Sequence, residues 1–268
     1  KALGTNEINE RSKINLAERL EQALPPTRLA FLKLIAEQAH NQRTGLYIVG
    51  GFVRDLVLGR PSLDFDIVVE GDAIALARSL ERKYGGRLVT HSRFGTAKWK
   101  INGVRTKLAR RLTGIDFSQP NALPESLDLI SARNEFYEKP TALPVVESGN
   151  IKLDLHRRDF TINTLAVRLD GRHYGDLYDY WGGLNDLEKG LVRVLHSLSF
   201  VDDPTRMLRA VRFEQRFGFR IEKRTLELVE EARPLLKQVS GDRLRHELDL
   251  ILSEDNAAAM LARLQVLD

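Results

Sequence analysis

The spacing of hydrophobic positions changes several times along the first half of the chain, which predicts alternating helices and strands. Leucine and alanine recur every three or four residues in some segments, as on the buried face of a helix, whereas short β-branched runs between turn residues are typical of strands. The predicted helices cover residues 15–40, with a break at Pro25-Pro26, 52–58 and 73–84. The predicted strands cover residues 47–49, 64–69, 87–90, 96–101 and 126–133.

The pattern is harder to interpret between these elements and becomes helical further on. Asn102-Gly103 is a hairpin signal. Residues 107–124 mix a basic cluster with polar and proline-containing segments and are interpreted as an exposed insertion, and residues 134–149 have the composition of a loop. Helical spacing predominates from Asp159 onward and is strongest after Val201. We therefore expect an α/β unit followed by a helical one.

Composition limits the class of protein without selecting one. The 268 residues are 43% hydrophobic, which is enough for a substantial core and for more than one domain. Lys and Arg number 41 against 37 Asp and Glu, so the net charge is +4 and a polyanionic partner is compatible but not required. The lack of cysteine excludes disulfides and cysteine-ligated zinc. We find no signal peptide and no apolar run of membrane-spanning length, so a cytoplasmic location and no membrane partner are expected.

Two aspartates stand at the start of a predicted strand. In an extended segment Asp64 and Asp66 lie on one face while Phe65 points to the other. Carboxylates arranged in this way can hold Mg²⁺. A lone pair of aspartates is also compatible with a solvated turn or a helix cap. Asp128 lies on another predicted strand, where it shares a face with Ile130.

A glycine pair precedes these aspartates at a predicted strand-to-helix turn. Gly50-Gly51 allows the backbone to approach a phosphate closely, and the amides of the following helix would point at the anion. It is not a P-loop, because no Gly-Lys-Ser/Thr follows. Arg54 is placed to contact phosphate oxygens with Asp55 as its anchor, although both residues also suit an ordinary helix surface.

Two further polar motifs lie in the second half of the chain. Arg157-Arg158-Asp159 is interpreted as the start of a helix, where guanidinium groups favour phosphate and Asp159 is also a good cap. Asn163 would share the helix face of Asp159, so both could contact one ligand. In Asp202-Asp203-Pro204-Thr205-Arg206, Asp203 and Arg206 would be neighbours on a helix whose first turn contains Pro204.

Together these motifs resemble the motif series of class II tRNA nucleotidyltransferases and bacterial poly(A) polymerases. The series runs in the same order from Tyr47 to Leu252. The resemblance implies an α+β fold, with a polymerase-β-like nucleotidyltransferase head followed by an all-helical neck and the start of a body. We assign the head to residues 1–160 and the helical unit, which would select nucleotides and bind RNA, to residues 161–268.

The resemblance also implies roles for individual residues. Asp64, Asp66 and Asp128 would be catalytic, and Asp64 and Asp66 would hold two Mg²⁺ ions. The carboxylate of Asp203 and the guanidinium of Arg206 would contact the Watson–Crick edges of CTP or ATP. The family commonly has glutamate where Asp202 stands. The nucleotide-binding set would be Gly50, Gly51, Arg54, Arg157, Arg158, Asp159, Asn163, Asp202, Asp203, Arg206 and Arg209.

Two helical segments near these motifs have an ordinary and a functional interpretation. Arg209, Arg212, Arg216 and Arg220 form a basic stripe that is either a solvated face or a surface for RNA phosphates. Residues 240–247 resemble another neck motif, in which Arg243 and Glu247 would pair with each other and brace the nucleotide-reading helix.

The implied activity is the template-independent addition of CMP and AMP from CTP and ATP to the 3′ end of tRNA. Poly(A) polymerase and CC-adding or A-adding enzymes share the same head and neck and stay open, as does, more remotely, an RNA-binding protein without catalysis. Residues 133–154, where the family has a flexible loop, disfavour a CC-only enzyme. The oligomeric state stays open, and the chain is expected to be a fragment that stops where the family continues into body and tail.

Overall fold

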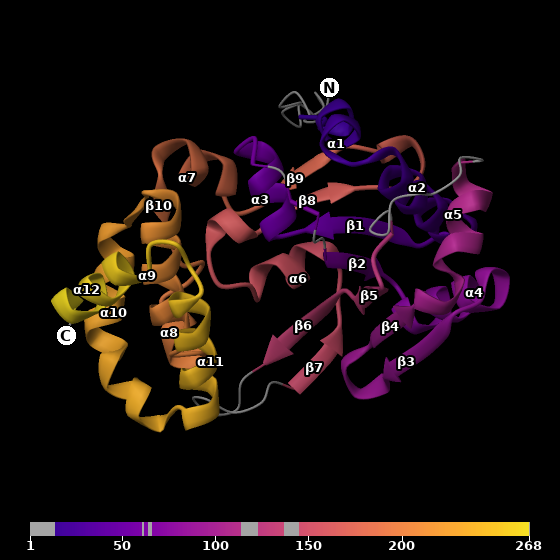
Figure 1. The fold of residues 1–268 in the computed structure, drawn as a ribbon. Coiled ribbons are helices and arrows are strands. Elements are labelled where there is room, and N and C mark those ends of the chain that lie inside the picture. Colours follow the sequence, from indigo (N-terminus) through magenta and orange to yellow (C-terminus); the bar gives the residue numbers. More distant parts are fainter. Residues whose placement is uncertain (1–13, 61, 64–65, 114–122, 137–144, 268) are drawn as a thin grey trace, which may run out of the picture.

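A seven-stranded sheet forms the first part of the molecule (Figure 1). The computed structural model describes residues 14–60, 62–63, 66–113, 123–136 and 145–267. The strands follow the order β3-β4-β5-β2-β1-β8-β9, in which β2 and β5 are parallel and the other neighbours are antiparallel. Their bounds are β1 Gly45–Val49, β2 Asp66–Glu70, β3 Arg87–His91, β4 Thr96–Lys100, β5 Ser126–Ser131, β8 Leu165–Arg168 and β9 Leu177–Asp179.

The two faces of this sheet are covered differently. Alternate residues such as Ile67 and Leu129 point into the larger core, together with Trp99, whose indole N–H donates to the carbonyl oxygen of Gly85. The helices before β5 all have buried side chains in this core: α1 (Ala17–Ala23), α2 (Pro26–Asn41), α3 (Gly51–Val57), α4 (Ala73–Tyr84) and α5 (Arg105–Thr113). The same core continues into the helices that follow the sheet. On the opposite face a smaller core forms around Val68 and Leu155, the latter from α6 (Ile151–His156).

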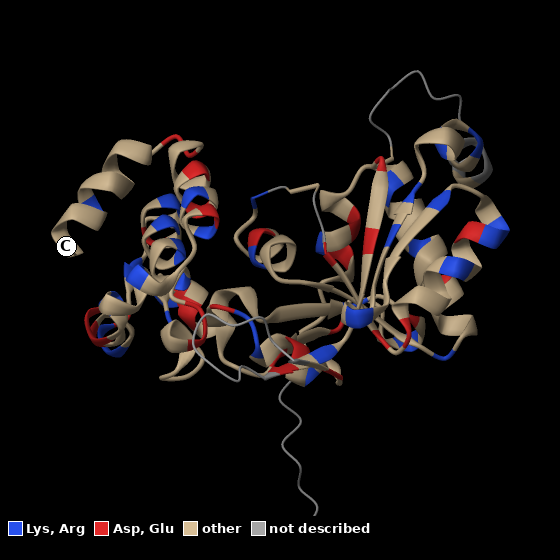
Figure 2. Ribbon diagram, turned by 90° about the horizontal axis from the view of Figure 1, so that it is seen from below, with Lys and Arg blue, Asp and Glu red and all other residues tan. Residues whose placement is uncertain are grey.

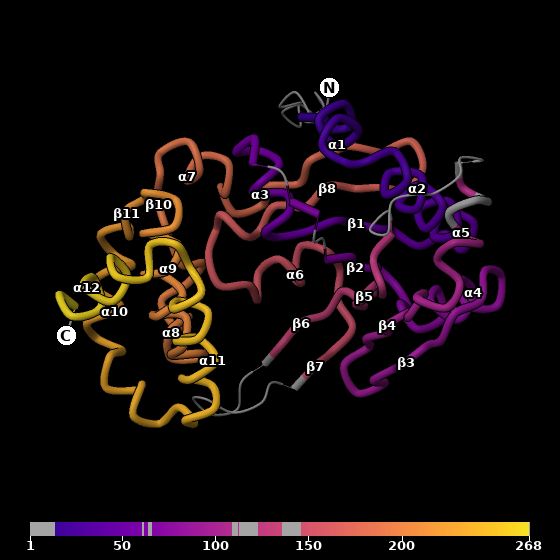
Figure 3. Tube along the Cα trace, viewed as in Figure 1, coloured from indigo at the N-terminus to yellow at the C-terminus, as the bar shows by residue number. Residues whose placement is uncertain are grey.

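A group of short helices follows the sheet (Figure 3). The central helix is α9, which packs against α8, α11 and α12 and against the small parallel pair β10 and β11. Phe213 of α9 meets Phe160 edge to face, with 5.7 Å between the ring centroids, so this helix also packs on the sheet-bearing part. The bounds are α7 Gly183–Lys189, β10 Leu191–Val192, α8 Ser199–Asp202, α9 Arg206–Phe217, β11 Arg220–Ile221, α10 Lys223–Ala232, α11 Gly241–Leu252 and α12 Ala257–Leu267.

The expected α+β class is confirmed, and most of the expected elements are present. The helices α2, α3 and α4 and the strands from β1 to β5 lie where the periodicity predicted them, within a few residues. Among the described residues no helix is both long and apolar enough to cross a membrane.

Three predictions about the middle of the chain are wrong. Asn102-Gly103 does not form a hairpin but begins a 3₁₀ turn that leads into α5. The start of the supposed exposed insertion belongs to this helix, and its Leu108 is buried in the core, whereas residues 114–122 lie outside the described residues. The supposed loop after residue 133 contains the hairpin of β6 (Arg133–Phe136) and β7 (Val145–Ser148).

The chain also returns to the sheet after the position where helices were expected. Strands β8 and β9 follow residue 160, so the expectation of helical structure from Asp159 onward is wrong for this segment. The boundary that we placed after residue 160 falls inside the sheet, before its last two strands. Short apolar runs such as residues 165–167 suit a buried strand and a buried helix equally, because periodicity alone cannot separate them.

Candidate active site

Two carboxylates lie side by side on the parallel strands β2 and β5. The register of β2 with β5 pairs Ile67 with Leu129, which places Asp66 next to Asp128, on the face opposite to these core residues. Both aspartates are exposed, and Asp128 forms an ion pair of 3.2 Å with Lys98 of β4. Asp64 lies outside the described residues, so its expected position beside Asp66 stays a prediction.

These carboxylates line a cavity of about 760 Å³. Gly51 and Arg54 of α3 contribute to the same wall, so the cavity joins three of the sequence motifs expected to act together. Arginines from three further helices also line it: Arg28, Arg105 and Arg216. A cavity that holds two carboxylates among several guanidinium groups suits a ligand with phosphate groups and a bound cation.

The carboxylate oxygens in this cavity are suitable ligands for Mg²⁺. No group of three or more histidine, aspartate or glutamate side chains suited to a metal ion occurs among the described residues, which do not include Asp64. Mg²⁺ usually takes only one or two protein carboxylates and completes its shell with phosphate oxygens and water. The adjacent, exposed carboxylates of Asp66 and Asp128 meet that requirement.

The glycine pair makes a tight turn between β1 and α3. Gly50 has a φ of 71°, which is strained for other residues, and a Cβ there would lie 2.7 Å from Nη1 of Arg158. Glycine at this position therefore allows the Arg158 guanidinium to approach the backbone at the start of α3. Asn163 approaches the same turn, since its carbonyl oxygen would lie 3.7 Å from that Cβ.

Arg54 is held firmly between the sheet-bearing part and α9. Its guanidinium forms two hydrogen bonds to Asp55 (2.9 and 3.1 Å) and donates to Oδ1 of Asn163 at 2.7 Å. It also stacks over the ring of Phe217, 4.6 Å from the centroid. Arg54 is 5% exposed. Asp55 anchors it as the sequence suggested, and most of its N–H donors are already occupied.

The segment Arg157-Arg158-Asp159 does not begin a helix. It follows α6, and a 3₁₀ turn over Thr161–Asn163 comes after it. Asp159 and Asn163 still meet, because Nδ2 of Asn163 donates to Oδ1 of Asp159 at 2.9 Å across this turn. The prediction that Asp159 and Asn163 lie close together is therefore confirmed, but a turn and not a shared helix face brings them together.

Asp159 is a buried carboxylate that contacts α9. Arg209 of α9 lies 2.7 Å from its Oδ2, and the Phe160 amide and Asn163 donate to its Oδ1. Burial alone would favour the protonated acid, but the Arg209 charge and the hydrogen bond from Asn163 outweigh it and hold the pKa of Asp159 below its usual value. Asp159 therefore joins the two parts of the molecule as an ionised group.

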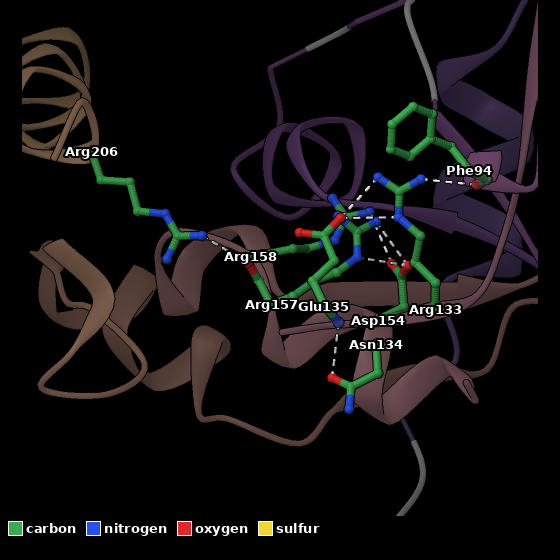
Figure 4. A network of polar contacts seen from close by, with 8 residues as sticks. All are labelled: Phe94, Arg133, Asn134, Glu135, Asp154, Arg157, Arg158 and Arg206. Atoms are coloured by element: carbon green, nitrogen blue, oxygen red, sulfur yellow. Dashed lines mark hydrogen bonds and ion pairs between the residues drawn. The ribbon is translucent and has the colours of Figure 1, made fainter. Parts of the chain in front are cut away.

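Figure 4 shows a network of acidic and basic side chains next to this turn. Arg157 donates to Asp154 (2.8 Å) and to Glu135 (3.1 Å), and Arg158 lies 3.3 Å from the other oxygen of Asp154. Arg133 completes the network through Glu135 and also donates to the carbonyl oxygen of Phe94. Sequence reasoning missed both acids. Asp154 could have been found, because it stands three and four residues before the two arginines.

The second acidic motif is divided between two helices. Asp202 ends α8 and Arg206 begins α9, so the expectation that Asp203 and Arg206 share one helix is wrong. Oδ1 of Asp203 accepts from the backbone and hydroxyl of Thr205, at 3.0 and 2.7 Å, which ties it to the turn before α9. Burial raises the pKa of Asp202, whose Oδ2 lies 3.9 Å from the ring of His196.

Arg206 bridges the two parts of the molecule. Its Nη2 donates to the carbonyl oxygen of Arg157 at 2.9 Å (Figure 4). Its Nη1 donates to the hydroxyl of Ser199 at 2.8 Å. The side chain is buried. Arg206 thus connects the start of α9 with the segment that carries Arg157, Arg158 and Asp159.

The expected pair of Arg243 and Glu247 does not form. Arg243 donates to Oδ1 of Asp203 at 2.7 Å, while the buried Glu247 lies 4.0 Å from Arg209 and 3.9 Å from Arg212. Both residues of α11 therefore brace the start of α9, as the motif predicted, but through different partners. Together with neighbouring side chains, Asp203, Arg209, Arg243 and Glu247 line a second hollow of about 290 Å³.

The arginine stripe on α9 is largely neutralised by acids. Arg209 pairs with Asp159, Arg212 lies near Glu247, and Arg216 pairs with Glu254 at 3.4 Å. Figure 2 shows blue and red segments mixed on these helices. Arg220 lies beyond the helix in β11 and is exposed. The interpretation of the stripe as an RNA surface stays a prediction.

Comparison with known proteins places this arrangement in a family. Residues 46–193 match the model of the poly(A) polymerase head domain, and residues 218–267 match a segment described as a probable RNA and SrmB-binding site of polymerase A. The chain therefore belongs to the poly(A) polymerase head domain family. The matched range includes the three motifs that line the larger cavity and the returning strands β8 and β9.

Individual relatives in this family are tRNA nucleotidyltransferases. The chain is 41% identical over 259 residues to an A-adding tRNA nucleotidyltransferase of Geobacter sulfurreducens, covering 96% of this chain and 27% of that protein. A solved CCA-adding enzyme in an apo form has a TM-score of 0.81 and 41% identity, with coverage of 95% of this chain and 56% of the other. The Thermotoga maritima CCA-adding enzyme complexed with tRNA has a TM-score of 0.79 and 39% identity, with coverage of 95% and 54%. The chain thus spans at most a little over half of these relatives.

Proposed function

We propose that this chain is the catalytic and nucleotide-selecting part of a template-independent nucleotidyltransferase that adds CMP and AMP to the 3′ end of tRNA. CTP and ATP would be the substrates, and pyrophosphate would leave. The observation that supports the proposal best is the cavity in which Asp66 and Asp128 lie next to Gly51 and Arg54. A tRNA substrate also implies that the protein works in the cytoplasm.

The carboxylates would hold the metal ions of this reaction. We propose Asp64 and Asp66 as ligands of two Mg²⁺ ions, with Asp128 as the third catalytic acid on the neighbouring strand. When bound, the ions lower the pKa of the attacking 3′-hydroxyl and neutralise the departing pyrophosphate. Arg54 has most of its donors occupied, so its proposed role is to hold α3 and the glycine turn in place beside the triphosphate.

Selection of the base is proposed for the start of α9. A carboxylate such as that of Asp203 accepts from the exocyclic amine of cytosine or adenine, and a guanidinium such as that of Arg206 donates to their ring or carbonyl acceptors. Arg157, Arg158, Asp159, Asn163 and Arg209 connect these two residues to the glycine turn through the contacts described above. The proposed division is therefore catalysis by the sheet-bearing part and base choice by the helical part.

Addition of AMP alone is a second candidate. The observation in its favour is the 41% identity to an A-adding enzyme, whereas the solved structures of similar identity are CCA-adding enzymes. The two kinds of enzyme differ in the nucleotides that the whole proteins are named as adding: A alone, or C, C and A. Both candidates need the same cavity and the same chemistry, so a substrate test must separate them.

The test offers the purified protein three RNAs, each with CTP or ATP: tRNA lacking CCA, tRNA ending in CC, and an unstructured RNA. CCA addition predicts that CMP is added to the first and AMP to the second. AMP transfer to the second without any CMP transfer would favour the A-adding candidate, and extended AMP addition to the unstructured RNA would favour poly(A) synthesis. No transfer to any RNA would refute an active nucleotidyltransferase.

A matched pair of variants tests the cavity itself. Asp66→Asn removes the charge of a cavity carboxylate and should lower kcat by at least about a hundredfold, because the metal ion loses a ligand. Asp249→Asn makes the same chemical change on the exposed surface of α11 and should leave kcat unchanged. Equal activity of the two variants would contradict the proposed role of Asp66.

A further inference from the structure

A row of basic side chains extends from the carboxylate of Asp128 on β5 across the next two strands of the sheet. Asp128 of β5 pairs in register with Lys98 of β4, and Lys100, two residues on, pairs with Arg87 of β3. Residues paired in register share a face, as do residues two apart on one strand. Lys98, Lys100 and Arg87, which we call the basic row, therefore lie on the same face as Asp128.

This face is the one that the helices leave open at β3 and β4. The helix α4 packs on the other side of these strands, where Ala97 and Trp99 are buried in the larger core (Figure 1). Lys100 and Arg87 are exposed, and the side chain of Lys98 is 44% exposed. Lys98 pairs with Asp128, whereas within the described part of the chain neither Lys100 nor Arg87 forms an ion pair. Two of the three side chains in the row thus carry positive charge that no acidic side chain of the described residues pairs with.

We propose that the basic row binds the phosphate backbone of the single-stranded 3′ end of the RNA whose terminal hydroxyl reacts. This inference rests on the proposed function, because it needs an RNA end at the carboxylates. Neighbouring strands are about 4.8 Å apart, so the row reaches about 10 Å from β5 to the sheet edge. A polyanionic strand that ends at Asp66 and Asp128 would find its preceding phosphates over positive charge along this row.

The α9 stripe is a weaker candidate for this role. Three of its four arginines face Asp159, Glu247 or Glu254, so phosphate groups would have to compete with these acids. The basic row has one such contact, between Lys98 and Asp128, and a metal ion at Asp128 would weaken it by competing for the carboxylate.

The test compares two double variants that each remove two positive charges. One changes the open face of β3 and β4, and the other changes α4, which covers their opposite face. Arg87→Ala/Lys100→Ala shortens the basic row, and Arg78→Ala/Arg82→Ala removes two exposed arginines from α4, on the helical side of the same strands. The affinity of each protein for a fluorescently labelled single-stranded RNA ending in CC is measured by anisotropy over a range of salt concentrations. Thermal unfolding of both variants confirms that they are folded.

The variant Arg87→Ala/Lys100→Ala, which we call the row variant, should bind the RNA about tenfold more weakly than the unmodified protein. The slope of log K against log salt concentration should become shallower by about 1.4, because two phosphate contacts are lost. In turnover assays the KM of the row variant for tRNA ending in CC should rise while its KM for ATP stays unchanged, and the α4 variant should resemble the unmodified protein. An equal loss in both variants, an unchanged RNA affinity in the row variant, or a rise confined to the KM for ATP would overturn the inference. The anisotropy needs no nucleotide transfer, so failure of the proposed function is detected separately.

Discussion

The ion pair between Asp159 and Arg209 should be a measurable link between the sheet-bearing part and α9. Asp159 is 5% exposed and accepts hydrogen bonds from the Phe160 amide and from Asn163, while the Arg209 guanidinium lies 2.7 Å from its second oxygen. The substitution Asp159→Asn keeps the shape of the side chain and removes its charge. An amide in this place also turns an N–H group towards a guanidinium that has only donors.

The size of the effect follows from the burial of the two partners. Removing one partner of a fully buried ion pair costs about 3–5 kcal/mol, because the other charge is left without compensation. The Arg209 side chain is 32% exposed, so water recovers part of that cost. We therefore expect Asp159→Asn to lower the free energy of unfolding by about 2–3 kcal/mol. In a double-mutant cycle with Arg209→Met, the coupling energy between the two side chains should be about 1.5 kcal/mol.

The assay is urea unfolding of the parent, both single variants and the double variant at pH 7, followed by the parent and Asp159→Asn at lower pH. The pKa of Asp159 is lowered in the folded protein, so its stabilising contribution is complete above the unfolded pKa of about 4 and is lost as the pH falls through the folded pKa. The difference in unfolding free energy should stay constant between pH 8 and pH 5 and shrink below about pH 4. A coupling energy below about 0.5 kcal/mol would refute the link.

Three further predictions concern the cavity, the glycine turn and α5. Asp128→Asn should lower nucleotide transfer by at least about tenfold without lowering the midpoint of thermal unfolding, since the carboxylate is exposed; a loss of activity that only parallels unfolding would contradict its catalytic role. Gly50→Ala should destabilise the fold by about 1 kcal/mol more than Gly59→Ala, measured by urea unfolding, because both glycines have positive φ but only at Gly50 would a Cβ meet Arg158. Leu108→Ala should reduce the unfolding free energy by about 2–4 kcal/mol, and an effect below about 0.5 kcal/mol would show that α5 is not part of the core.

Elements could be predicted from the sequence where the spacing of their apolar residues agrees with the side that they bury in the fold. The helix over Ala73–Tyr84 coincides with the prediction, because its apolar positions form one stripe and it ends at Gly85. The helix over Arg105–Thr113 was missed, since its basic residues outnumber the apolar ones and the single spaced pair of Leu108 and Leu112 gives little periodicity. The hairpin of β6 and β7 and the strands β8 and β9 were missed because strands this short depend on their partners rather than on their own pattern.

For the candidate site, the sequence predicted some of the residues that lie together but not the contacts that they make. The motif pattern correctly brought Asp66, Asp128 and the glycine turn to one cavity. It gave no sign that Glu135 accepts from Arg157, or that Arg206 contacts the carbonyl oxygen of Arg157, because these partners are distant in sequence and meet only through tertiary packing. The same limit explains why Arg243 was paired with Glu247 on its own helix rather than with an acid on another element.

The inner position of β1, between β2 and β8, also has a consequence for how the chain folds. Ile48 pairs with Ile67 on one side and with Val167 on the other, more than a hundred residues further along the chain. During synthesis one edge of β1 therefore stays without its partner until β8 has left the ribosome, and such long-range pairing slows folding. A ribosome paused before residue 165 would expose the edge of a nearly apolar strand. This intermediate should be the species most prone to aggregation and most dependent on chaperones.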